Sequence, residues 1–154
     1  MCSLQSSKLY AIIVLAKANK PSNKGDIAMY NSKFGIEIEM TGITRNEAAR
    51  IAAEHLGGTI TNGGDYYDTQ KVTAADGRVW KFMFDASIVK QHRVRGRRTS
   101  ASDRAYSVEL VSPILTYNED INTLQELVRK LRKAGAFANT SCGIHYQKLE
   151  IIQS

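Results

Sequence analysis

The sequence lacks several features that would place it in a familiar class at once. It has two cysteines in 154 residues, Cys2 and Cys142, which form neither a disulfide framework nor a zinc-binding spacing. We therefore expect both to be reduced thiols in a cytoplasmic protein. No apolar run approaches the roughly 20 residues of a membrane span, so a membrane partner is not expected. No serine lies in the Gly-x-Ser-x-Gly context of a hydrolase nucleophile, and no repeat or low-complexity segment occurs.

What is present is an ordinary globular composition with an excess of positive charge. Hydrophobic residues make up 43% of the chain and charged residues 23%. The net charge is +6 and the isoelectric point is about 9.4, which favours anionic partners such as nucleotides, nucleic acid or acidic peptides. Much of this charge lies between His92 and Arg104, a stretch that contains five arginines and a single acidic residue, Asp103.

The length predicts one domain, which we place at residues 33–154, preceded by an N-terminal extension at residues 1–32. Residues 10–16 are apolar and are compatible with a short secretory signal or with a strand or helix outside the main fold. Residues 21–25 have the composition of a linker, and Met29 would make a natural initiator. We therefore expect the extension to be sequence that lies in front of the true start of the protein.

The segment from Phe34 to Met40 has the alternating pattern of a half-buried strand. Its apolar residues share one face, and Glu37 and Glu39 share the other, with Cα atoms roughly 6–7 Å apart along an extended chain. Like charges repel at this range, so the pair calls for a counter-charge. A divalent metal would supply it, and a solvated outer face is the alternative.

The rest of the pattern predicts an α+β fold. Thr44 and Glu47 form a capping box that opens a helix ended by Gly57, and a second amphipathic helix over residues 121–131 is ended by Gly135. An Asp76-Gly77 turn joins two predicted strands, and the arginine-rich stretch 92–104 shows no apolar periodicity and is predicted to be a loop. The remaining strands are predicted at residues 66–72, 79–84, 106–112 and 143–147. We expect an antiparallel sheet with helices packed on one face.

If the aromatic face of this sheet is buried, its other face collects four carboxylates and one imidazole. Bare, these groups would repel one another strongly, and hard oxygen ligands at this density suit Mg²⁺ or Mn²⁺. Bound metal would in turn organise phosphate groups, and the neighbouring arginines could neutralise charge on them. The predicted set is Glu37, Glu39, Asp85, Glu109 and His145.

Four motif segments follow one another along the chain. They are Phe34-Gly35-Ile36-Glu37-Ile38-Glu39-Met40, Trp80-Lys81-Phe82-Met83-Phe84-Asp85-Ala86-Ser87, Val108-Glu109-Leu110-Val111-Ser112-Pro113 and Asn139-Thr140-Ser141-Cys142-Gly143-Ile144-His145. In this order they resemble the amidoligase family of the glutamine synthetase and glutamate–cysteine ligase superfamily. The resemblance covers about Lys33 to His145 and implies a partial glutamine-synthetase-like catalytic fold.

The resemblance implies an ATP-dependent carboxylate–amine ligase that forms an amide through an acyl phosphate. By position, Glu37, Glu39 and Glu109 would be the ligands of Mg²⁺ or Mn²⁺ and would hold the nucleotide phosphates. Asp85 would be a further acidic ligand or lie near the amine, and His145 would face the nucleotide or the transferring phosphoryl group. The implied partners are ATP, a carboxylate substrate and an amine, the latter two being an amino acid, a peptide or a protein.

The sequence departs from the family pattern near its end. Gln147 stands where the family has a second histidine after Gly-Ile-His, and the chain stops at Ser154. A C-terminally truncated, inactive form is therefore an open expectation.

Two readings from other classes also remain. One is a basic nucleic-acid-binding module carried by the arginine-rich stretch, although no aromatic residues interleave its arginines for base stacking. The other is a non-catalytic fragment that acts through a partner.

Overall fold

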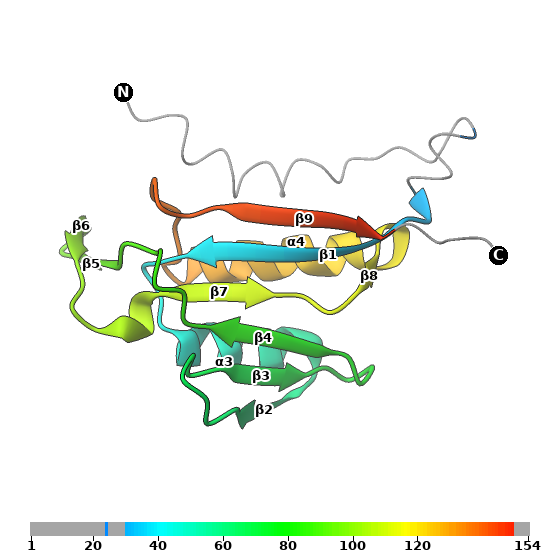
Figure 1. The fold of residues 1–154 in the computed structure, drawn as a ribbon, viewed down its shortest axis with the longest axis horizontal. Helices are drawn as coiled ribbons and strands as arrows, with labels where there is room; N and C mark the ends of the chain where they lie inside the picture. The colour runs from blue at the N-terminus through cyan, green and yellow to red at the C-terminus, as the bar shows by residue number, and fades with distance from the viewer. Residues whose placement is uncertain (1–23, 25–29, 150–154) are drawn as a thin grey trace.

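The computed structural model describes Lys24 and residues 30–149, whose main feature is an antiparallel sheet (Figure 1). Its strands follow the order β2-β3-β4-β7-β1. Strand β9 pairs with the free side of β1, and the short β8 pairs with the start of β1 on the same side as β7. The sheet strands are β1 (Lys33–Met40), β2 (Thr59–Asn62), β3 (Gln70–Thr73), β4 (Val79–Met83), β7 (Val108–Val111), β8 (Leu115–Thr116) and β9 (Ile144–Leu149). The expectations for residues 1–23 and 25–29, including the apolar run and Met29, lie outside the described residues.

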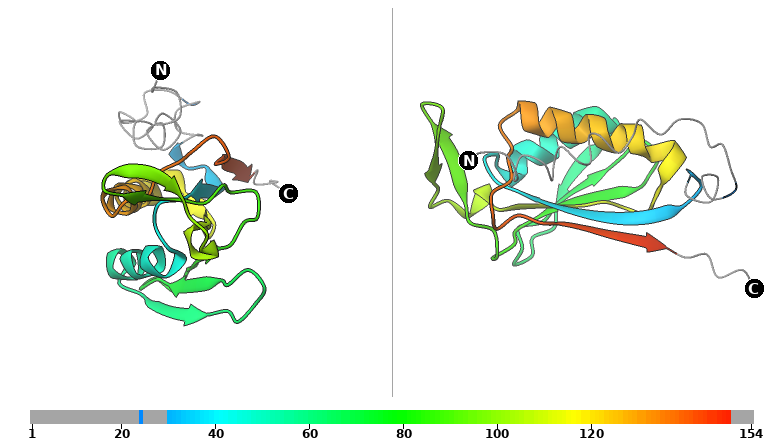
Figure 2. Two further views of the ribbon diagram at one scale, coloured as in Figure 1. Left: turned by 90° about the vertical axis from the view of Figure 1, so that its left-hand side faces the viewer. Right: turned by 90° about the horizontal axis from the view of Figure 1, so that it is seen from above.

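Two helices, α3 (Arg45–Leu56) and α4 (Tyr117–Lys133), cover one face of the sheet (Figure 2). The Thr44 hydroxyl accepts the Glu47 N–H at the start of α3, and Gly57 ends the helix in the left-handed conformation at φ 61°. The predicted α+β architecture, with helices on one face of an antiparallel sheet, is confirmed. No helix among the described residues is long and apolar enough to cross a membrane.

The core lies between the sheet and these two helices. Alternate residues of β1, β3, β4 and β7 enter the core, so the opposite face of the sheet is left open to solvent. The largest fully buried side chains of the core are Trp80, Phe34, Phe82, Ile38, Met40, Ile43, Leu110, Leu115, Leu124, Leu127, Leu131 and Val72.

The arginine-rich stretch is a β-hairpin and not the predicted loop. Strands β5 (Gln91–Val94) and β6 (Arg97–Ser100) pair through a two-residue turn in which Arg95 and Gly96 both have positive φ, 51° and 78°. This is the turn geometry that suits a tight hairpin. The guanidinium groups of Arg93 and Arg98 stack on the Phe137 ring, 4.6 and 4.2 Å from its centre. These cation–π contacts take the place of an apolar strand face in the hairpin. The stretch therefore shows no alternation of apolar residues from which strands could be predicted.

Two predicted strands are shorter than their patterns suggest. Residues 66–69 form a turn and a short loop before β3, because the Asp65 carboxylate accepts hydrogen bonds from the Thr69 N–H at 2.9 Å and from the Thr69 hydroxyl at 2.7 Å. This local bonding captures backbone that a strand would need. Tyr106 belongs to a 3₁₀ turn, η1 (Arg104–Tyr106), capped by the Asp103 side chain. Strands β2 and β8 were not predicted, since β2 is exposed throughout and β8 has two residues.

We expect Asp120→Asn to lower the free energy of unfolding by about 1–3 kcal/mol, as breaking a partly buried charge pair does. Asp120 is buried and accepts two hydrogen bonds from the Arg78 guanidinium, at 2.6 and 2.8 Å, which lowers the pKa of Asp120. Arg78 also binds the more exposed Asp76. Urea denaturation would check this, with Asp76→Asn as the matched control that should cost less. Equal effects of the two substitutions would contradict the prediction.

Candidate functional site

The open face of the sheet brings acidic residues of three neighbouring strands together. Glu39 of β1 is paired with Glu109 of β7, and Glu109 is paired on its other side with Met83 of β4. Asp85 follows two residues after Met83, so its side chain reaches the same end of this face. Glu39, Asp85 and Glu109 each offer a carboxylate oxygen within 4.8 Å of the others. We call these three residues the carboxylate group.

The other two predicted site residues lie beside this group. Glu37 precedes Glu39 by two residues on the same face, and its register partner in β9 is His145. His145 Nε2 lies 3.7 Å from a Glu39 carboxylate oxygen. The structure therefore brings all five predicted residues to one surface, with Glu37 and His145 flanking the carboxylate group.

Burial and like charge act together on Glu109. They raise its pKa to about 7: burial is the largest cause, followed by the charges of Glu37, Asp85 and Glu39, and His145 opposes them. Among the described residues, no lysine or arginine forms an ion pair with any of these four carboxylates. Within this part of the chain, His145 is the basic side chain that partly offsets the negative charge of the face.

The backbone around Gly143 fixes the orientation of Glu39. The Gly143 N–H donates to Glu39 Oε2 at 2.5 Å, and the Glu39 N–H donates to the Gly143 carbonyl at 3.1 Å. A Cβ at position 143 would lie 3.3 Å from Glu39 Oε2 and 3.4 Å from His145 Nε2. Glycine therefore allows the loop before β9 to approach the carboxylate closely.

Two residues that sequence reasoning missed hold Asp85 in place. The Ser107 hydroxyl accepts the Asp85 N–H at 3.0 Å and donates to the Asp85 carbonyl at 2.7 Å. The Ser107 carbonyl in turn accepts a hydrogen bond from the buried Arg45 guanidinium at 2.7 Å. No sequence signal identifies this chain of contacts, because an arginine in the first turn of an amphipathic helix looks solvent-exposed.

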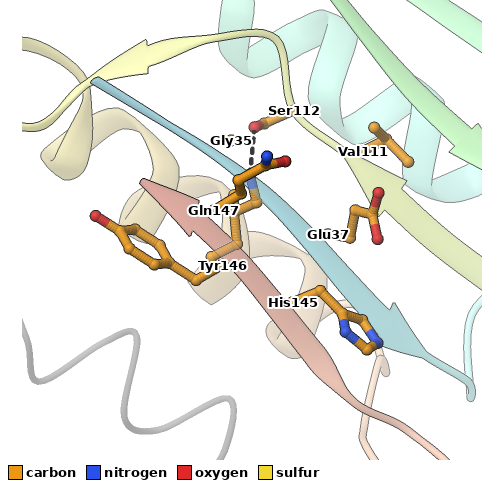
Figure 3. A pocket seen from close by; sticks show the side chains of 8 residues that line it. Gly35, Glu37, Val111, Ser112, His145, Tyr146 and Gln147 are labelled. Carbon is orange, nitrogen blue, oxygen red and sulfur yellow. Dashed lines mark hydrogen bonds between the residues drawn. The ribbon is translucent and has the colours of Figure 1, made fainter. Parts of the chain in front are cut away.

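A hollow of about 270 Å³ lies over β1 next to the carboxylate group (Figure 3). Gly35 stands in the strand at this point, with Gln147 as its partner in β9. Side chains of β1, β7 and β9 surround it. The lining residues are Gly35, Ile36, Glu37, Val111, Ser112, His145, Tyr146 and Gln147.

The donor chemistry of the carboxylate group fits a hard divalent cation. Its members present only oxygen atoms, which suits Mg²⁺ or Mn²⁺ better than softer metals. Burial first and the neighbouring carboxylates second raise the pKa of Glu109, and a bound cation would favour its charged form. Glu39, Asp85 and Glu109 could therefore hold such an ion.

In the absence of metal, we expect the raised pKa of Glu109 to give an unusual pH dependence of stability. The folded-state pKa of about 7 exceeds the ordinary value of 4.5, so ionisation opposes folding. The stabilising contribution is complete below the ordinary pKa and is lost as pH rises through about 7. Glu109→Gln removes it, so the variant should gain stability over the parent progressively from about pH 5 to about pH 8. Urea denaturation with a chelator at each pH would measure this difference, and a constant difference would contradict the expectation.

Comparison with known proteins gives a family but no individual relative. The model of the family described as "Putative amidoligase enzyme" matches residues 30–147, which include the sheet, both covering helices and all five site residues. No curated protein and no solved structure matches the chain.

Proposed function

The chain belongs to the amidoligase family, and on this premise we propose that it is an ATP-dependent ligase that joins a carboxylate to an amine. Family membership indicates a ligase-type function. The observation that supports the finer proposal is the carboxylate group on the open face, where three oxygen ligands lie within 4.8 Å of one another. Phosphoryl transfer needs mainly positioning and charge neutralisation, which such a group provides by holding a metal.

In the proposed mechanism, Glu39, Asp85 and Glu109 would hold Mg²⁺ or Mn²⁺. When bound, the ion neutralises phosphate oxygens and orients the nucleotide. Glu39 keeps its orientation through the Gly143 N–H, and Asp85 through Ser107. Asp85 thereby joins the ligand set, whereas the family resemblance implies Glu37, Glu39 and Glu109 as ligands. Glu37 stays at the edge of the set, facing the hollow.

The proposed reaction has two steps. A substrate carboxylate oxygen attacks the γ-phosphorus of ATP, the bond to the ADP oxygen breaks, and an acyl phosphate forms. The amine nitrogen then attacks the acyl carbon, phosphate leaves, and the nitrogen loses a proton to give the amide. His145, 3.7 Å from Glu39, lies where it can contact the nucleotide or the transferred phosphoryl group.

Thermal melts of the purified chain with ATP, Mg²⁺, both or neither would test the nucleotide part of this proposal. We expect a saturable rise in the melting temperature that needs both, because a ligand stabilises only the state that binds it. Mg²⁺ with ADP should give a smaller rise, since one phosphate fewer reaches the metal. A cooperative melt that ATP and Mg²⁺ do not shift would contradict the proposal.

A further inference from the structure

The β5–β6 hairpin concentrates positive charge at one end of the molecule, beyond the end of the sheet (Figures 1 and 2). Its two strands and their turn contain four exposed arginines and no acidic residue, and no ion pair among the described residues includes them. The end of α4, with the exposed Arg132 and Lys133, lies close by, because Arg93 donates to the Gly135 carbonyl at 3.0 Å. The hairpin therefore attracts an anionic partner. Its arginines are Arg93, Arg95, Arg97 and Arg98.

Arg95 stands at the tip of the hairpin in a backbone conformation that arginine disfavours. Its φ of 51° lies in the left-handed region, and Gly96 follows with a φ of 78°. Asparagine or glycine is the usual residue at the first position of such a turn, since other side chains are strained there. Strain of this kind is commonly kept where a side chain has a task outside the fold.

The outer edge of β6 is open. The Ala101 N–H donates to the Lys90 carbonyl at 3.0 Å, just below the hairpin. Because paired and outward-facing residues alternate in an antiparallel ladder, the backbone N–H and C=O groups of Arg98 and Ser100 point away from β5. No strand of the described residues pairs with β6 on that side. The edge can therefore accept a further strand.

The outer edge of β5 differs, because the segment after β1 already occupies its base. The Gln91 N–H donates to the Thr41 hydroxyl at 2.8 Å, and the Gly42 N–H donates to the Gln91 carbonyl at 2.9 Å. These contacts anchor the hairpin to the body of the protein. They leave β6 as the edge on which another chain can be added.

The chemistry of this edge favours a polypeptide over a nucleic acid. A row of N–H and C=O groups needs a partner with both acceptors and donors, which a peptide backbone supplies and a phosphodiester group does not. The aromatic ring nearest the arginines, Phe137, is buried beneath Arg93 and Arg98, so it cannot stack on a base. A second copy of β6 would place arginine beside arginine, which is unfavourable.

We propose that β6 binds an extended acidic segment of a partner polypeptide, which adds to the hairpin as a third strand. Main-chain hydrogen bonds to Arg98 and Ser100 hold the segment, and its carboxylates meet the guanidinium groups of Arg95, Arg97 and Arg98. Arg97 and Arg98 lie on opposite faces of β6, so acidic side chains on either face of the added strand find a partner. This surface is separate from the carboxylate group, and its occupation requires neither metal nor nucleotide.

The test is a titration of the ¹⁵N-labelled protein, without metal or nucleotide, with an end-blocked peptide of alternating threonine and glutamate. We expect saturable amide shifts in β6 and slower hydrogen exchange of the Arg98 and Ser100 amides. The Thr99 amide, which already faces β5, should change less. A peptide with glutamine in place of glutamate should not bind at the same concentrations. An analogue that keeps its charges but is N-methylated along the backbone should leave the Arg98 and Ser100 amides unprotected.

The variants remove charge from the hairpin and preserve its fold. Arg95→Asn should melt at the same temperature as the parent or higher, because asparagine suits the turn better. Together with Arg97→Gln it should weaken peptide binding about tenfold, as the loss of two exposed ion pairs does. Arg50→Gln removes the same charge from α3 and should bind the peptide like the parent. Should the double variant not fold, weaker binding by Arg95→Asn alone decides.

Three outcomes would overturn the proposal. Without saturable shifts, the arginines would only keep the edge of β6 from pairing with other chains. Equal binding by the N-methylated analogue, or binding without protection of Arg98 and Ser100, would reduce the contact to general charge attraction. Tighter binding of an oligothymidylate of the same net charge would assign the hairpin to nucleic acid. None of these results bears on the ligase proposal, which the melts with ATP and Mg²⁺ test separately.

Discussion

Glu109→Gln should weaken Mg²⁺-dependent nucleotide binding by about 100-fold, or roughly 2.7 kcal/mol, and still stabilise the metal-free protein near pH 8. Both effects have one cause. Glu109 lies between Glu39 and the end of β4 that leads to Asp85, so it is the central member of the carboxylate group. Burial, reinforced by the neighbouring carboxylates, raises the pKa of Glu109 to about 7, so its charge is disfavoured when no cation is bound. A neutral isostere removes the repulsion together with the metal ligand.

Calorimetric titration with Mg²⁺ and ATP, paired with urea denaturation in chelator, would measure the two effects on the same preparation. Glu126→Gln is the matched control, since it makes the same chemical change at an exposed position of α4 and should alter neither quantity. Nucleotide binding equal to that of the parent would mean that the carboxylate group is ordinary solvated surface. Loss of stability at every pH would mean that Glu109 has a structural role instead.

The features predictable from sequence are those encoded by local periodicity. Phe34 to Met40 alternates strictly, so the face that carries Glu37 and Glu39 follows from the pattern alone. Thr44 and Glu47 likewise mark the start of α3. Glu109 and His145 also lie in strands where apolar and polar residues alternate. Their position on the open face can therefore be predicted once an antiparallel sheet is assumed.

The features that sequence missed depend on contacts between distant segments. The β5–β6 hairpin is held by stacking of Arg93 and Arg98 on Phe137, a residue that follows α4. The hollow over Gly35 forms only when β9 aligns Gln147 with it. Such pairings leave no periodic trace, so a single sequence predicts neither of them.

Arg45→Met should lower the free energy of unfolding by about 2–4 kcal/mol, because the substitution leaves backbone carbonyls inside the protein without a hydrogen-bond donor. The Arg45 side chain is 3% exposed and donates to the carbonyls of Arg104 and Ser107 at 2.6 and 2.7 Å. It also pairs with Asp68 at 2.9 Å. Methionine is similar in length, so the loss reflects the two unpaired carbonyls more than an empty space.

The same substitution should also affect the proposed metal-binding group, because Ser107 links Arg45 to Asp85. Arg45 holds the Ser107 carbonyl, and the Ser107 hydroxyl holds the backbone of Asp85, so Asp85 loses its fixed position when Arg45 is replaced. We expect Mg²⁺ affinity to fall by about 10-fold in Arg45→Met, and by a similar factor in Ser107→Ala, as for residues that orient metal ligands.

Arg50→Met is the matched control for both measurements. It lies on the same helix, but its side chain is 57% exposed and its ion pair with Glu54 is a surface pair, worth at most about 1 kcal/mol. Urea denaturation would compare the three variants, and calorimetric Mg²⁺ titration would compare those that remain folded. If Arg45→Met were as stable as Arg50→Met, the hydrogen bonds of the buried guanidinium to Arg104 and Ser107 would not be what holds α3 against the segment before β7. Full Mg²⁺ affinity in a Ser107→Ala variant that had lost stability would contradict the proposal that Asp85, held by Ser107, is one of the metal ligands.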